Sequence, residues 1–218
     1  MWTEQILQMI GKGVLETLYM TLVSTLFGYV LGLPFGIVLA ITDKNGICPN
    51  RFIYRSLDIL ANILRSIPFL ILLILLIPFT RFVVGKSYGS SATIVPLVIA
   101  AAPFIARMIE SSIKEVDSGV IEAAKSMGAN NFTIIAKVLL VEARTSILVG
   151  VTIAIGTILG YSAMAGTVGG GGLGDIAVRY GYYRYEEDIM IVTVILLILL
   201  VQIFQFVGMR LANVVNHK

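Results

Sequence analysis

Long apolar segments alternate with short polar ones along most of the chain. The predominantly apolar segments cover residues of about 14–42, 59–84, 87–110, 143–165 and 188–210. An α-helix needs about 20 such residues to cross the hydrocarbon core of a bilayer. No polar linker is long enough to separate two domains. The pattern therefore predicts an all-α polytopic membrane protein with five transmembrane helices in one domain, residues 1–218.

Glycine and proline modify two of these segments. Three glycines fall four residues apart in the first segment: Gly28, Gly32 and Gly36. This small-residue spacing is typical of a helix face that approaches a neighbour closely. The second segment contains Pro68 and Pro78, which lack the backbone donor and leave carbonyls without an intrahelical partner. Those carbonyls need partners inside the protein, so the second helix is predicted to line the interior of the bundle.

The loop at residues 114–141 has a different, water-facing pattern. Asp117 or Ser118 can cap a first short helix, and Gly128 suits the position after its end, where φ is positive. Asn130 or Asn131 can cap a second one. Apolar residues recur at helical spacing in both: Val120, Ile121, Ala124 and Met127, then Ile134, Ile135, Val138 and Leu139. The loop is predicted to form two amphipathic helices around a glycine turn.

Composition agrees with membrane insertion. The chain is 57% hydrophobic and only 13% charged, with a mean hydropathy of +0.93, whereas soluble domains carry about a quarter charged residues. The single cysteine, Cys48, excludes an intrachain disulfide framework and a multi-cysteine metal cluster.

Basic residues predict the orientation. If the loop at 114–141 is cytoplasmic, the inner side holds eleven of the 16 basic residues, namely Lys44, Arg51, Arg55, Arg65, Arg107, Lys114, Lys125, Lys137, Arg144, Arg210 and Lys218. The outer side then holds Lys12, Arg81, Lys86, Arg179 and Arg184. Because cytoplasmic segments are enriched in Lys and Arg, we expect the N-terminus outside and the C-terminus in the cytoplasm.

Two glycine-containing stretches invite a nucleotide-site interpretation. Gly85-Lys86-Ser87 resembles the end of a phosphate-binding loop, but Thr80 stands where a glycine is required and a helix precedes it. It is predicted to be a turn. The glycine run at 166–174 lacks a following Lys-Ser or Lys-Thr and is predicted to be a hinge or a close-packed turn.

Ionisable residues of the apolar segments are expected near span ends: Glu16, Asp58, Arg65, Arg107 and Glu110. Proton-driven carriers usually place an ionisable residue mid-span. A transporter of this kind would then be passive or would receive its energy from a partner.

One motif in the loop resembles a known family. Glu122-Ala123-Ala124, followed after three residues by Gly128 and then by Val138 and Leu140, is similar to the EAA loop of ABC-importer permeases. Val138 replaces the usual isoleucine. Val141 replaces a proline, which leaves the break before the next helix less sharply defined. Without the resemblance, an amphipathic connector at the membrane surface would explain the loop equally well.

Four further stretches resemble the methionine-importer branch of that family: residues 32–42, 65–81, 94–110 and 160–174. The resemblance implies a non-enzymatic permease in a bacterial inner membrane that imports methionine, including its L- and D-forms. It implies a homodimer, two cytoplasmic ATPase subunits that bind ATP and Mg²⁺, an extracytoplasmic substrate-binding lipoprotein, and no cofactor or nucleic acid bound by this chain. Glu122, Ala123, Ala124 and Gly128 would couple to the ATPases, and Met164, with Tyr161 and Ser162, would form the gate. The alternatives are a permease for another amino acid or a methionine derivative, a stand-alone channel or carrier, and a scaffold.

Overall fold

The computed structural model describes residues 4–215, which leaves out Lys218 of the predicted inner side. Its regular elements are all helical. They are α1 (Glu4–Thr42), α2 (Arg51–Ser66), α3 (Phe69–Leu75), α4 (Ile77–Val84), α5 (Ser90–Lys114), α6 (Ser118–Ser126), α7 (Asn131–Thr133), the π-helix η1 (Ile134–Leu139), α8 (Leu140–Glu142), α9 (Arg144–Ala165), the 3₁₀-helix η2 (Gly166–Val168), α10 (Gly172–Ile176), the π-helix η3 (Ala177–Tyr182) and α11 (Glu187–Val215). The prediction of an all-α protein is confirmed for these residues.

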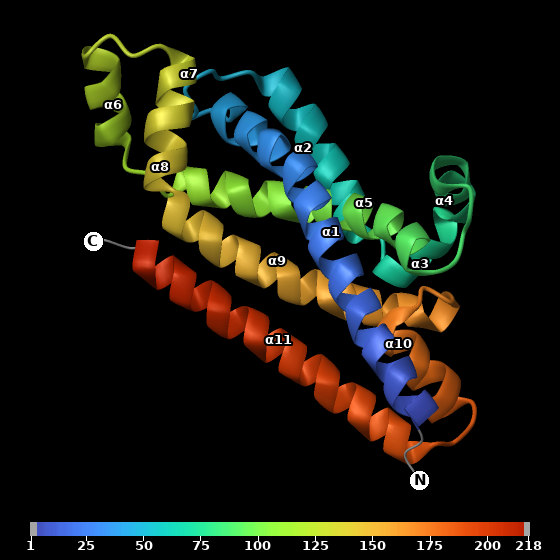
Figure 1. The fold of residues 1–218 in the computed structure, drawn as a ribbon. Coiled ribbons are helices and arrows are strands. Elements are labelled where there is room, and N and C mark those ends of the chain that lie inside the picture. Colours follow the sequence, from blue (N-terminus) through green and yellow to red (C-terminus); the bar gives the residue numbers. More distant parts are fainter. Residues whose placement is uncertain (1–3, 216–218) are drawn as a thin grey trace.

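Four helical segments in the described part are long and apolar enough to cross a membrane: α1, α5, the run from α9 to η3, and α11. The bent pair of α2 and α3 makes a fifth if it counts as one span. In Figure 1 the loop that carries α6 and α7 lies at one end of the bundle, and the turn before α10 lies at the other. The described chain starts at the α10 end, and α11 runs back toward the end that holds α8.

The second span differs from the prediction of one helix at 59–84. Helix α2 begins at Arg51, inside the expected polar loop, where the Asn50 side chain accepts hydrogen bonds from the backbone amides of Phe52 and Ile53. It ends before Pro68, and α3 then leaves at an angle of 100°. Proline disfavours the helical conformation of the residue before it, and Ile67 is extended (φ −82°, ψ 122°). The proline therefore divides the segment instead of kinking it.

Pro78 has a milder effect because it falls in the first turn of α4, where a missing backbone donor costs little. Gly85 ends that helix in the left-handed conformation (φ +79°), so Gly85-Lys86-Ser87 is a turn, as predicted. The helices also exceed the predicted spans elsewhere. α1 starts at Glu4, α5 continues to Lys114 and α11 to Val215.

The glycines of α1 provide the close contact that the sequence predicted, and the partner is α5. A Cβ atom on Gly32 would lie 2.8 Å from the carbonyl oxygen of Ala102, and one on Gly28 would lie 2.9 Å from a methyl carbon of Ile105. Gly36 packs in the same way against Ala106 and Ile109. Since these positions have no room for a side chain, the backbones of α1 and α5 meet directly at the centre of the fold.

Candidate functional site

The loop between α5 and α9 forms the predicted pair of helices, with the predicted caps. The carboxylate of Asp117 accepts a hydrogen bond of 2.7 Å from the amide of Gly119 and starts α6. The side chain of Asn130 accepts one of 2.8 Å from the amide of Thr133 and starts α7. We call residues 117–142 the coupling hairpin.

Gly128 ends α6 for a defined backbone reason. Its φ is +80°, and its amide donates to the carbonyl of Lys125 (2.9 Å) while the amide of Ala129 donates to that of Ala124 (3.1 Å). This pair of bonds is a Schellman motif, which requires a left-handed residue at its centre. A Cβ atom at Gly128 would meet nothing within 4 Å. The requirement for glycine therefore comes from backbone conformation and not from packing.

Packing inside the hairpin covers only one side of α6. Ala124 is buried, as are Ile134 and Leu139 of the second helix, so the predicted stripe of that helix is confirmed. Glu122 and Ala123 are exposed. Met127, which shares the helical spacing of Ala124, is 81% exposed.

Phe132, at the start of the second helix, is 77% exposed. The sequence analysis did not single it out, because an apolar residue next to a cap gives no periodic signal. Phe132 and Met127 are the most exposed apolar side chains of the hairpin, and we call these two residues its apolar tip. Such residues are typical anchors for a partner.

The second hairpin helix runs almost directly into α9. Ala143 forms a one-residue turn between α8 and α9, and its amide still donates to the carbonyl of Leu139 (2.9 Å). This agrees with the expectation that Val141, in place of a proline, leaves the break less sharp. The hairpin and α9 are therefore joined by nearly continuous helical hydrogen bonding.

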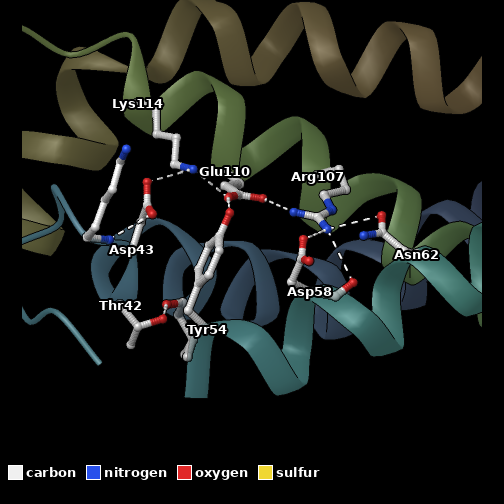
Figure 2. Close-up of polar contacts among 10 residues, drawn as sticks. Thr42, Asp43, Tyr54, Asp58, Asn62, Arg107, Glu110 and Lys114 are labelled. Carbon is white, nitrogen blue, oxygen red and sulfur yellow. Dashed lines mark hydrogen bonds and ion pairs between the residues drawn. The ribbon is translucent and has the colours of Figure 1, made fainter. Parts of the chain in front are cut away.

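A chain of charged side chains connects the hairpin end of α5 with α1 and α2 (Figure 2). Glu110 is buried and accepts hydrogen bonds from Arg107 (2.7 Å), Lys114 (2.7 Å) and the hydroxyl of Tyr54 (3.2 Å). Arg107 is also paired with Asp58 of α2. Sequence analysis placed these residues near span ends but did not identify their pairing, because the partners lie 49 positions apart in the chain.

The chain of ion pairs ends at Asp43, directly after α1. Its carboxylate pairs with Lys114 (3.0 Å) and accepts a hydrogen bond from the amide of Lys44 (2.7 Å). Partial burial opposes its ionisation, but these bonds outweigh that effect and lower the pKa of Asp43. The ion pair is therefore intact at neutral pH and fixes the end of α1 to that of α5, four residues before α6 begins at Ser118.

At the opposite end, the glycine run is a close-packed turn. The amide of Gly172 donates to the carboxylate of Glu16 (2.9 Å), and the amide of Leu173 donates to the hydroxyl of Thr17 (2.9 Å). The amide of Gly89 donates to the carbonyl of Gly169 (2.9 Å). The turn is thus bonded to the first half of α1 and to the residue that caps the start of α5.

The three residues predicted for the gate lie on the last turns of α9. Met164 is 51% exposed. The ring of Tyr161 stacks on that of Phe69 in α3, with centroids 4.5 Å apart. Ser162 is buried and donates to the carbonyl of Leu159 (2.7 Å), so within this chain it faces the interior. Among residues 4–215, no group of three acidic, histidine or cysteine side chains is placed to hold a metal ion.

Comparison with known proteins decides the family. A family model described as the binding-protein-dependent transport system inner membrane component matches residues 32–218. This chain belongs to that permease family. The coupling hairpin of the permease contains the family-like Glu-Ala-Ala motif, and the matched region includes every helix from α2 onward.

Named relatives are similar over most of the permease. The probable D-methionine transport system permease protein MetI of Vibrio cholerae is 52% identical over 203 residues, which cover 93% of this chain and 90% of the relative. The D-methionine transport system permease protein MetI of Escherichia coli K12 is 49% identical over 164 residues, covering 75% and 76%.

Solved structures share the fold. A chain of the MetNI methionine ABC transporter, described as inward facing, superimposes with a TM-score of 0.98 at 47% identity and covers 99% of this chain and 100% of the other. A chain of an amino acid ABC transporter crystallised with histidines has a TM-score of 0.79 at 20% identity, which supports the fold alone.

The ion-pair chain of Figure 2 yields a test of what holds the hairpin end together. We expect Glu110→Gln to destabilise the protein by roughly 3 kcal/mol, because removing one member of a buried ionic cluster leaves its partners uncompensated. The measurement is the midpoint of thermal unfolding in detergent. The control is Glu115→Gln, since Glu115 is exposed and bonded only to Ser146. Equal midpoints for both variants would contradict this assignment.

Proposed function

We propose that this chain is the membrane-spanning subunit of an ATP-driven importer that moves methionine, in its L- and D-forms, into the cytoplasm of a bacterial cell. The observation that carries the proposal is the coupling hairpin. It presents Glu122, Ala123, Met127 and Phe132 uncovered at one end of the bundle. The similarity to permeases named for methionine transport supports the substrate.

The proposed assembly contains two copies of this chain, two cytoplasmic ATPase subunits that bind ATP with Mg²⁺, and an extracytoplasmic substrate-binding lipoprotein. The hairpin would insert its apolar tip into a groove of an ATPase subunit. In the proposed orientation the hairpin end is cytoplasmic and the glycine-turn end faces the binding protein, which agrees with the basic residues near the hairpin.

Movement of the ATPase subunits would reach the membrane helices through the hairpin by two routes. One is the nearly continuous helix from α8 into α9, which leads to Met164. The other is the ion-pair chain that begins at Lys114. Lys114 pairs with Asp43 at the end of α1. It also pairs with Glu110, which is linked through Arg107 to Asp58 of α2. When the ATPases close on ATP, both routes would move the helix ends together and open the path toward the binding protein. Hydrolysis would return the permease to the inward-facing state.

Purification from native membranes tests the assembly. We expect tagged chain to copurify in mild detergent with an ATPase at one copy per permease, and with the binding lipoprotein when substrate is present. Reconstituted complexes should take up labelled methionine only with ATP inside. Recovery of the chain alone, or ATP-independent uptake, would support a carrier instead. Uptake of a different amino acid in preference to methionine would contradict the proposal that methionine is the substrate.

Variants of the hairpin test the coupling. We expect Glu122→Lys and Gly128→Val to abolish methionine uptake in inserted complexes while ATP hydrolysis continues. Valine in the left-handed conformation is strained by about 1–2 kcal/mol, so the turn would rearrange. Uptake and ATP hydrolysis are measured on the same proteoliposomes.

Two matched variants control that test. Gly128→Asn should retain uptake, because asparagine tolerates the left-handed conformation. Glu115→Lys reverses an exposed acidic charge outside the hairpin and should also retain it. Normal uptake by both Glu122→Lys and Gly128→Val would remove the coupling assignment.

The gate assignment has a separate test. Met164 is a flexible, half-exposed thioether on the last turn of α9, suited to plug a narrow pore and to move aside. We expect Met164→Ala complexes to leak preloaded methionine from proteoliposomes without ATP. Met209→Ala, a similarly exposed methionine on α11, should remain tight. A tight, fully active Met164→Ala complex would assign this residue to packing only.

A further inference from the structure

Helix α2 has a sharply divided surface. Its polar residues recur three and four positions apart: Arg51, Tyr54, Arg55, Asp58, Asn62 and Arg65. At 3.6 residues per turn they fall within an arc of about 120°. The other side carries the exposed apolar residues Phe52, Ile59 and Ile63, together with Ser56. We call the first side the polar face of α2.

Only part of the polar face is used for packing. Tyr54 and Asp58 bond to Glu110 and Arg107 of α5, and Asn62 accepts a hydrogen bond of 3.2 Å from Arg107. Arg55 and Arg65 are exposed and have no polar partner among residues 4–215. Arg51 on the same face is also exposed and has no polar partner among these residues, so three free guanidinium groups lie on a helix side whose Asp58 is paired.

The face extends far into the bundle. Arg65 lies in the last turn of α2, about 21 Å along the axis from Arg51. Four residues later, Phe69 stacks on Tyr161. Tyr161 lies about 26 Å along α9 from its start at the hairpin end. Arg65 therefore lies inside the bent pair of α2 and α3, which is one span if the pair is counted together.

A free charge at that depth cannot face hydrocarbon, because its transfer costs several kcal/mol, so it must border water or a partner charge. The hairpin end of α2 carries Arg51 and Arg55 on the same face, so the path from Arg65 toward that end is polar throughout. The apolar side provides the surface for lipid or for the second copy. A water-filled vestibule along the polar face, open toward the hairpin, would hydrate the charged side chains. It would leave the apolar side of α2 in contact with lipid or with the second copy.

The deep end of this face combines two complementary groups. Arg65 offers a guanidinium, which binds carboxylates in bidentate geometry. At the same place α2 ends at Ile67, and Pro68 cannot donate to the carbonyl of Leu64. The last carbonyls of a helix carry partial negative charge, which favours an ammonium group.

We propose that the end of α2, with Arg65 as its main ligand and Arg55 as the next group toward the hairpin, is a transit site for the zwitterionic main chain of the transported amino acid. Arg65 holds the carboxylate, and the carbonyls at the end of α2 hold the ammonium group. These groups are common to all α-amino acids. The site therefore binds the main chain of the substrate on its way to the cytoplasm and does not discriminate between side chains. The inference rests on the proposed import function.

Cysteine accessibility tests the vestibule without relying on transport. In a Cys48→Ser background, Ser66→Cys adds a thiol next to Arg65 in the chain, at the edge of the polar face of α2, and the matched control Ile63→Cys adds one on the apolar side less than one turn away. A charged, membrane-impermeant thiol reagent is applied from the hairpin side to the full complex without nucleotide. We expect Ser66→Cys to react at least roughly tenfold faster, because hydrocarbon excludes the charged reagent. Equal rates would overturn the vestibule.

Substrate protection and uptake test the site. Methionine should slow the labelling of Ser66→Cys, and Arg65→Gln should remove that protection. Arg65→Gln should also lower ATP-driven uptake by roughly tenfold, the equivalent of one charge-assisted bond, with partial recovery in Arg65→Lys. The control Arg51→Gln removes a charge from the same face at its hairpin end and should keep the protection. Unchanged protection and uptake in Arg65→Gln would overturn the site.

The two levels of the proposal fail differently. If wild-type complexes show no ATP-dependent methionine uptake, the proposed function is wrong. If they transport methionine while Ser66→Cys stays unprotected, the import function stands and the transit site is wrong.

Discussion

The direct contact between the backbones of α1 and α5 is the constraint on which the other features depend. Gly28, Gly32 and Gly36 leave no side chain between the two helices, and apolar lipid provides little hydrophobic force to hold helices together, so close packing and polar contacts must do it. The contact fixes both ends of the pair. At the hairpin end it brings Asp43 within 3.0 Å of Lys114. At the other end it places Glu16 beside the glycine turn, where its carboxylate accepts the amide of Gly172.

The polar groups at these ends are arranged so that few buried charges lack a partner. Glu110 receives three donors, and Arg107 is shared between Glu110 and Asp58. A buried ionic cluster adds little net stability compared with an apolar one, because desolvation offsets the Coulombic gain. Its value here is specificity of arrangement: it defines where α1, α2 and α5 meet, directly before the hairpin. A hairpin that must transmit movement needs such a fixed base.

Local features could be predicted from the sequence, and long-range ones could not. The helix caps and the turn at Gly128 depend on neighbours within a few residues, so residue type and spacing identified the turn and narrowed each cap to two residues, of which Asp117 and Asn130 are used. The division of the second span was missed because hydropathy treats residues 59–84 as one run, although Pro68 marked the break. The pairing of Asp58 with Arg107 and the stacking of Phe69 on Tyr161 depend on tertiary packing. For Met127, helical spacing grouped it with Ala124, but Met127 is the residue that caps the end of α6 and is 81% exposed, whereas Ala124 is buried.

The break after α2 explains why a chain with apolar composition can contain a charged helix. If α2 continued straight into α3, Arg65 would sit in the middle of an unbroken span, where a charge must be paired inside the protein or reach water. The 100° turn separates the two environments. The polar face of α2 bonds to α5 through Tyr54, Asp58 and Asn62, while the apolar α3 packs against α5 and α9 through Phe69 and Leu73. The stack of Phe69 on Tyr161 then lies between the charged face and Met164, one turn further along α9. This aromatic contact joins the start of α3 to the last turns of α9, directly beyond the end of the charged helix.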